Sequence, residues 1–203
     1  MNSLRKLIRE TLEGAVLNEA AVHISEILRN PNIGLIDSSS RTQLQLDLYD
    51  FYANRVLGTI GASHVADNIF HVTGVAAEKG YGPLMYEFAM MSIYDNGLTP
   101  TRSADIRGNA WEVWKKFYNR NDVNKFPIPE NSRAYSDEFD PGYYEDEAEG
   151  EEVIGNTAFT MPPSDEFKGL IERTPILMKI KKANKEDIRS RGGDYFSYKY
   201  ADS

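Results

Sequence analysis

Residues 73–83 read TGVAAEKGYGP, and this stretch decides the fold because it joins a predicted strand to a predicted helix. The β-branched and apolar residues over 68–76 (NIFHVTGVA) predict a strand that Gly74 interrupts. The nearly all-apolar run over 83–94 (PLMYEFAMMSIY) predicts a helix that is buried on most sides. A strand leading directly into a helix, repeated further along the chain, indicates an α/β fold with a partly parallel sheet.

The turn between this strand and this helix contains Gly80 and Gly82. Glycine permits positive φ and lets the backbone approach a ligand, while the start of a helix offers unpaired N–H groups and a positive dipole end. Pro83 suits the first helical turn, where its missing N–H costs little. The turn is therefore either a cradle for a pyrophosphate or a tight strand-to-helix connection without a ligand.

The chain before this stretch has mainly β signals. Residues 22–27 predict a first strand, and the Asn-Pro-Asn sequence at 30–32 predicts a turn after it. Polar and apolar residues alternate imperfectly over 43–51, which predicts a half-buried strand, and 55–63 (RVLGTIGAS) predicts its hairpin partner. The tyrosine-containing junction at 49–54 would form the turn of this hairpin.

Beyond the buried helix, Gly97–Thr99 predicts a short extended segment and 106–118 predicts an amphipathic helix. Residues 121–165 are rich in proline, glycine, serine and acid, so they predict a long excursion or a partly disordered loop. Residues 175–180 and 195–200 predict two late strands. The apolar stripe of the amphipathic helix consists of Ala110, Val113, Trp114 and Phe117.

These signals divide the 203 residues into four parts. Residues 1–19 are expected to form an N-terminal amphipathic helix, and 20–120 the α/β core. Residues 121–165 are the acidic excursion, and 166–203 would supply C-terminal strands that complete or extend the sheet.

The charge of the chain is concentrated in one segment. The formal net charge is −8, and residues 137–152 carry nine acidic and no basic residues, so −8 minus −9 leaves the rest at +1. Nothing here resembles the basic face that nucleic acid binding requires. A solvated loop is the expected role of the segment, with attraction of a basic partner as an alternative. The absence of cysteine excludes disulfides and thiolate metal sites, and three histidines make a histidine-rich metal site improbable.

The N-terminus has apolar residues at helical spacing within 3–13, interrupted by charges. The helix would pack on its own domain or dock on another protein. A signal peptide needs an unbroken apolar stretch, and no run in the chain approaches the roughly 18 apolar residues of a membrane span. An intracellular protein without a membrane segment is therefore expected. The apolar residues in question are Leu4, Leu7, Ile8 and Leu12.

The stretch VTGVAAEKGYGPLMYEF at 72–88 resembles the acetyl-CoA-binding motif of the GNAT superfamily of N-acetyltransferases. In that motif a strand leads into an Arg/Gln-x-x-Gly-x-Gly/Ala turn, which Gly80 and Gly82 match. RGNAWEVWKKFYNR at 107–120 resembles the family's Asn-x-x-Ala-x-x-x-Tyr helix, and 57–60 resembles the Gly-x-Ile of its third strand. The resemblance covers roughly residues 20–120 and is strongest to GNAT-like proteins of tailed phages.

The resemblance implies a mixed, mostly antiparallel sheet with a splayed parallel pair, flanked by helices. It also implies that the pantetheine arm of acetyl-CoA pairs with the open edge of the strand at 68–76, and that a bulge near Gly74 frees an N–H for the thioester carbonyl. Backbone amides of the following turn would hold the pyrophosphate. The implied cofactor-binding residues are Val75, Ala76, Lys79, Gly80, Tyr81 and Gly82.

The sequence departs from the family pattern at two positions. Ala77 stands where the family usually has arginine or glutamine, and Trp114 stands where it usually has a tyrosine general acid. Tyr118 lies one turn further and is the candidate catalytic residue, since the ordinary pKa of tyrosine, about 10, suits donation to a thiolate. The alternative is that Tyr118 only packs with the tryptophans. His71, a candidate base, is equally explained as a structural histidine.

The resemblance leaves three alternative functions for the chain. The chain is expected to be an acetyl-CoA-dependent N-acetyltransferase of a phage, with an unknown amine acceptor, in the host cytoplasm. Alternatively it is a catalytically silent GNAT-like domain that serves as a virion structural or adaptor protein. In that case the N-terminal helix or the acidic segment would contact phage or host proteins. A regulatory domain that binds acyl-CoA without turnover is the third possibility.

Overall fold

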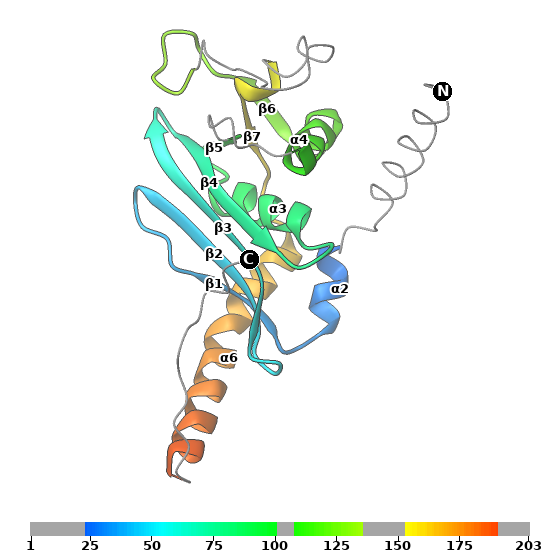
Figure 1. Cartoon of the computed structure of the whole chain (residues 1–203), viewed down its shortest axis with the longest axis vertical. Helices are drawn as coiled ribbons and strands as arrows, with labels where there is room; N and C mark the ends of the chain where they lie inside the picture. Colours follow the sequence, from blue (N-terminus) through cyan, green and yellow to red (C-terminus); the bar gives the residue numbers. More distant parts are fainter. Residues whose placement is uncertain (1–22, 101–107, 136–152, 191–203) are drawn as a thin grey trace, which may run out of the picture.

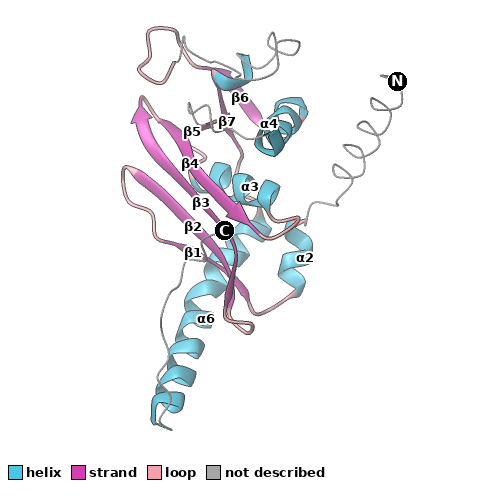
Figure 2. Ribbon diagram, in the orientation of Figure 1, coloured by secondary structure: helices cyan, strands magenta, loops and turns pink. Residues whose placement is uncertain are grey.

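The computed structural model describes residues 23–100, 108–135 and 153–190. Seven strands form one sheet in the order β1-β2-β3-β4-β5-β7-β6, in which β4 and β5 are parallel and every other neighbouring pair is antiparallel (Figures 1 and 2). The expected α/β fold, a mostly antiparallel sheet with a splayed parallel pair and flanking helices, is confirmed. The strands are β1 (Ile33–Asp37), β2 (Gln43–Asp50), β3 (Arg55–Ala66), β4 (Ile69–Ala77), β5 (Gly97–Thr99), β6 (Asn124–Pro127) and β7 (Thr157–Thr160); the helices are α2 (Ile24–Arg29), α3 (Gly82–Ser92), α4 (Gly108–Asn119) and α6 (Asp165–Ser190).

The predicted hairpin of β2 and β3 is confirmed, with Leu46 opposite Ile60 in an antiparallel register. Alternate residues of β2 point into the core. The imperfect alternation of polar and apolar residues in its sequence therefore corresponds to a strand with one buried face. At the turn, the Tyr49 hydroxyl donates a hydrogen bond to Asn54 Oδ1 at 2.9 Å. Asn54 has a φ of 57°, a left-handed conformation that asparagine tolerates better than most residues.

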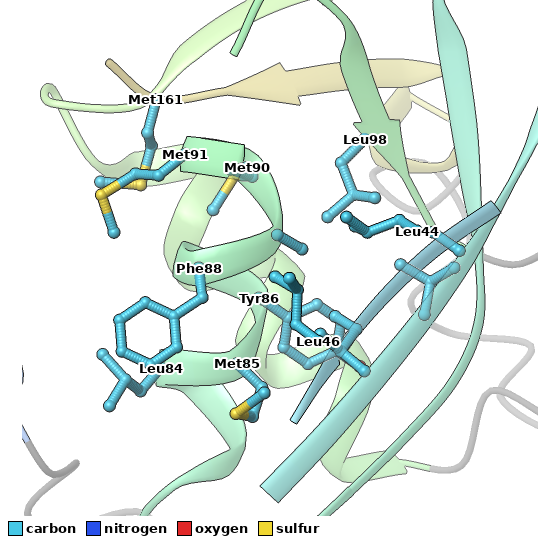
Figure 3. Close-up of a cluster of buried hydrophobic side chains, with 14 of the residues drawn as sticks. Leu44, Leu46, Leu84, Met85, Tyr86, Phe88, Met90, Met91, Leu98 and Met161 are labelled. Carbon is cyan, nitrogen blue, oxygen red and sulfur yellow. The ribbon is translucent and has the colours of Figure 1, made fainter. Parts of the chain in front are cut away.

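Helix α3 lies against β2, β3, β4, β5 and β7, and its side chains fill the centre of the core (Figure 3). The predicted burial on most sides is confirmed. Glu87, its only charged residue, pairs with Arg120, which follows α4. This ion pair links the C-terminal end of α4 to α3. The buried residues of α3 are Leu84, Met85, Tyr86, Phe88, Ala89, Met90 and Met91.

The strand predicted at 22–27 is wrong, because helix α2 begins at Ile24 within it; Val22 lies outside the described residues. Ile24 and Ile27 lie three residues apart on one helical face, and both are buried. His23 caps the helix by accepting a hydrogen bond from the Ser25 N–H at 3.3 Å. Arg173 of α6 donates to the carbonyls of Ile27 and Leu28, so tertiary contacts also complete the C-terminal end. The predicted turn at 30–32 is confirmed, and the sequence analysis missed β1 directly after it.

The C-terminal strand predicted at 175–180 is also wrong, because α6 runs through it with Pro175 inside the helix. Leu170, Thr174 and Leu177 are spaced to meet the sheet on one helical face. Thr174 Oγ1 accepts a hydrogen bond from the Leu35 N–H at 2.8 Å and donates to the Leu170 carbonyl at 2.8 Å. Helix α6 therefore covers the outer edge of β1 instead of adding a strand.

The predicted excursion over 121–165 is partly wrong, because β6 and β7 form an antiparallel pair within it. Strand β7 is buried and also pairs with β5, through Leu98 and Phe159, so the chain returns to the sheet. The residues of the acidic run from 137 onward lie outside the described residues. So do the helix expected at 3–13 and the strand expected at 195–200.

Candidate functional site

The parallel strands β4 and β5 separate after three residue pairs. Ile69, Phe70 and His71 of β4 face the three residues of β5, and the last pair is His71 with Thr99. The next residue is Pro100, which has no N–H with which to continue the ladder. From Val72 onward, β4 therefore pairs with β3 on one side and with no strand of the described chain on the other.

A bulge lies on β4 at this opening. Gly61 of β3 faces Gly74, and Ala62 faces Val72, so Thr73 is the extra residue of β4. The bulge predicted near Gly74 is confirmed. A Cβ added at Gly74 would meet no atom within 4 Å, so the space over that face of the strand is open there.

The turn after β4 is fixed by backbone hydrogen bonds. The Glu78 N–H donates to the Leu57 carbonyl at 2.8 Å, and the Tyr81 N–H donates to the Glu78 carbonyl at 3.0 Å. Gly80 has a φ of 88°, the left-handed region that favours glycine. The predicted conformational role of this glycine is therefore confirmed.

The start of α3 carries no side-chain cap. Tyr81 occupies the N-cap position in a helical conformation, and its side chain makes no capping hydrogen bond. Pro83 lies in the first turn, as predicted, and the first turn contains no acidic residue to balance the helix dipole. A Cβ added at Gly82 would meet no atom within 4 Å, so the approach to this helix end is open.

The structure thus brings the six predicted cofactor-binding residues together along one continuous path. Val75 and Ala76 lie on the open edge of β4, while the other four form the turn and the start of α3. The path offers mainly backbone donors and acceptors followed by the positive end of a helix dipole. Such a surface suits an extended ligand with amide groups at one end and an anionic group at the other.

Trp114 is part of the core on the inner side of α4. Its side chain is 1% exposed, and its ring lies 5.0 Å from Tyr86 of α3 and 5.0 Å from Phe159 of β7 between ring centroids. Burial raises the pKa of Tyr86 to about 12, which keeps that hydroxyl neutral. Trp114 therefore joins α4 to the core, and its indole ring has no acidic proton at neutral pH.

Tyr118 lies apart from the six residues in the contacts that the structure describes. Its ring packs edge-on to Phe159 at 6.5 Å, and Lys125 Nζ lies 5.9 Å from the ring centroid. Its side chain is 37% exposed. These contacts place Tyr118 over β6 and β7. His71, in contrast, lies at the mouth of the opening, as the last residue of β4 that pairs with β5.

Pro100 is the site residue that the sequence analysis missed. It is buried directly after β5, and it prevents β5 from closing the edge of β4. The sequence does contain a signal for this role, a Thr-Pro pair at the end of a three-residue strand. Proline cannot donate a backbone hydrogen bond, so it ends the pairing within a sheet.

No protein-family model, curated protein or solved structure matches the chain. Within residues 23–100, 108–135 and 153–190, no group of three histidine, aspartate or glutamate side chains is placed to hold a metal ion. Among the helices of the same ranges, none combines the length and apolar character needed to cross a bilayer.

Proposed function

We propose that the protein binds acetyl-CoA along the open edge of β4 and acts as an N-acetyltransferase of the GNAT type. One observation carries the proposal: a strand edge that pairs with no strand of the described residues leads through a glycine turn into a helix start without a side-chain cap. Edge strands that are left open are usually covered or blunted, so an uncovered interior edge needs a functional reason.

In this proposal the ligand takes the place of a missing strand. The amide groups of the pantetheine arm pair with the backbone of Val75 and Ala76, as an added strand would. The pyrophosphate lies against the turn from Lys79 to Gly82, where the dipole of α3 favours negative charge. The Tyr81 N–H already donates to the Glu78 carbonyl, so the Gly80 and Gly82 N–H groups are the donors in this proposal. The thioester lies near the bulge at Thr73, where a backbone N–H is free of the regular ladder.

The proposed reaction depends more on how the amine and the thioester are positioned than on reactive side chains of the protein. The acceptor amine attacks the thioester carbonyl carbon, the new C–N bond forms, and the C–S bond breaks to release CoA as a thiolate. The proton lost by the amine, directly or through water, neutralises the thiolate. An N–H donated to the carbonyl oxygen would stabilise the charge that develops there. Tyr118 is the candidate donor to the thiolate, which its contacts over β7 do not by themselves support.

The burial of Trp114 favours a second candidate function. Its ring fills the core where the related motif would place a tyrosine, so the chain retains the scaffold without that acid. A catalytically silent domain that binds acyl-CoA, or that serves a phage particle as a structural or adaptor protein, would keep this arrangement. An acetyltransferase would transfer the acetyl group to an amine, whereas a silent domain would not. Among silent domains, one that binds a ligand would bind CoA, and a purely structural one would not.

The decisive experiment is a calorimetric titration of acetyl-CoA and CoA into the full chain and into Gly82→Trp. We expect micromolar binding to the wild-type protein and none to the variant, because the indole would occupy the open space at the start of α3. Gly82 has no positive φ and a Cβ there meets nothing within 4 Å, so the variant should fold.

Gly169→Trp is the matched control. Gly169 lies on α6, and a Cβ there also meets nothing within 4 Å, so the control adds the same side chain away from the site. Binding that survives in Gly82→Trp, or no binding to the folded wild-type chain, would contradict the proposed cofactor site. Binding without acetyl transfer to any amine would favour the silent domain.

A further inference from the structure

The second half of α6 exposes a surface that the rest of the described chain does not cover. Figure 1 shows the helix running past the end of the sheet. Thr174 and Leu177 face β1, whereas the apolar side chains between and beyond them face outward. The exposed fractions are 60% for Ile176, 48% for Met178 and 52% for Ile180.

This surface is also positively charged. Residues 174–182 contain three lysines and no acidic residue. Lys179 and Lys182 are exposed, while Lys181 turns inward and lies 4.2 Å from the ring of Tyr49. We call the exposed set the α6 tip; it consists of Ile176, Met178, Lys179, Ile180 and Lys182.

A binding partner for the α6 tip must therefore combine negative charge with apolar or aromatic side chains. The segment 137–152 has nine acidic residues and also contains Phe139, Tyr143 and Tyr144. The amphipathic sequence at 3–13 fits less well, since Arg5, Lys6 and Arg9 would meet lysines of like charge.

Chain length favours a contact between two copies over one within a copy. The described residues next to the acidic segment are Tyr135 and Val153. Tyr135 packs against the same small cluster around Ile69 as Ala66, which ends β3. The Val153 carbonyl accepts a hydrogen bond from Thr157, next to Ala158 of that cluster. The α6 tip lies at the other end, where Lys181 contacts Tyr49, the partner of Val56. The ten residue steps from Val56 to Ala66 span roughly 33 Å at about 3.3 Å per residue.

The segment from 135 to 153 has 18 residue steps, so a loop that extends toward the α6 tip and returns has nine steps in each direction. Fully extended, it reaches roughly 31 Å at about 3.5 Å per step, which leaves no residues with which to cover a surface. A second copy has no such limit. We propose that the acidic segment of one copy binds the α6 tip of another, which produces head-to-tail self-association.

Such a contact joins two different surfaces, so it leaves one α6 tip and one acidic segment available at the ends of each dimer. The average mass should therefore keep rising with protein concentration instead of stopping at a dimer, unless a ring closes. The attraction is between exposed charges, so it should weaken as salt shortens the screening length from roughly 10 Å at 0.1 M to roughly 3 Å at 1 M.

Sedimentation velocity on the full chain tests this, over a range of protein concentrations at low and high salt. We expect association at low salt that is largely lost at 1 M salt. Lys179→Glu with Lys182→Glu should leave a monomer under all conditions. The matched control, Arg41→Glu with Lys116→Glu, reverses two exposed charges elsewhere and should associate like the wild type.

A mixing experiment makes the test independent of any single variant. A second variant replaces the nine acids of 137–152 with asparagine or glutamine, and it should also be monomeric alone. Mixed with the lysine variant it should form a dimer and nothing larger, because each partner retains one half of the contact. A wild-type monomer at every concentration, association that survives the lysine reversal, or a mixture that remains monomeric would overturn the proposal.

Discussion

At the scale of single residues, Trp114 connects three elements of the molecule. Its ring packs on Tyr86 of α3, on Phe159 of β7 and on Phe117 one turn further along α4. Aromatic pairs at such centroid distances add to the free energy of burying the rings. Trp114 is therefore also one of the most buried residues of the fold.

We predict that Trp114→Ala lowers the free energy of unfolding by about 3–5 kcal/mol, because it removes a large buried ring and leaves a cavity. Urea unfolding followed by circular dichroism measures this loss. Tyr118→Phe is the control, since it removes only a hydroxyl from a side chain that is 37% exposed, and it should change stability by less than about 0.5 kcal/mol. A small loss for Trp114→Ala would mean that the aromatic cluster does not hold α4 in place.

At the scale of elements, Gly34 sets the distance between β1 and α6. A Cβ at this position would lie 2.7 Å from Thr174 Oγ1 and 3.0 Å from the ring of Phe51. Thr174 cannot turn away without losing its hydrogen bond to the Leu35 N–H, which would then be unsatisfied at a buried edge. The close approach of helix and strand therefore depends on the missing side chain.

We predict that Gly34→Ala destabilises the fold by about 1–3 kcal/mol, the usual cost of forcing an extra carbon into a packed contact. Gly74→Ala provides the comparison within the same sheet. It adds the same methyl group where no atom lies within 4 Å, so its effect should stay within about 0.5 kcal/mol. Equal effects for the two variants, measured by urea unfolding, would show that α6 can move off β1 without cost.

At the scale of the whole molecule, the three edges of the sheet differ in how they are protected. Helix α6 covers β1, and β6 carries Lys125 and Pro127, residues that blunt an exposed edge. The edge of β4 beyond His71 lies inside the sheet, and among the residues that the structure describes no strand pairs with it. This difference is the reason why we propose a ligand site at the edge of β4.

The continuous sheet also predicts how the molecule unfolds. One hydrophobic core includes residues of α2, β1 to β5, α3, α4, β7 and α6. We therefore expect one cooperative thermal transition. Both tryptophans of the chain, Trp111 and Trp114, lie on α4, so their fluorescence reports that side of the sheet, while far-ultraviolet circular dichroism reports all elements. Separate midpoints for the two signals would mean that the β5–β7 side unfolds as a unit of its own.

The sequence by itself determined the elements whose pattern is local. The alternation in β2, the apolar run of α3, the stripe of α4 and the glycine turn at 80–82 each lie within a few residues of one another. These patterns depend on side-chain spacing and backbone conformation, which neighbouring residues settle. The six residues of the proposed cofactor site lie along one continuous path for the same reason, because they are consecutive or nearly so.

Only the tertiary structure decided the elements whose local signals conflict with their contacts. Residues 24–27 and 175–180 each contain two isoleucines, which favour strands, yet they lie in helices because Ile24 and Ile27 of α2 and Thr174 and Leu177 of α6 pack one helical face each. The opening beside β4 also depends on residues far apart in the chain. It requires β5 to stop at Pro100 and β7 to pair with β5 on its other side. Burial free energy across the sheet outweighs local propensity at these positions, and sequence spacing does not contain it.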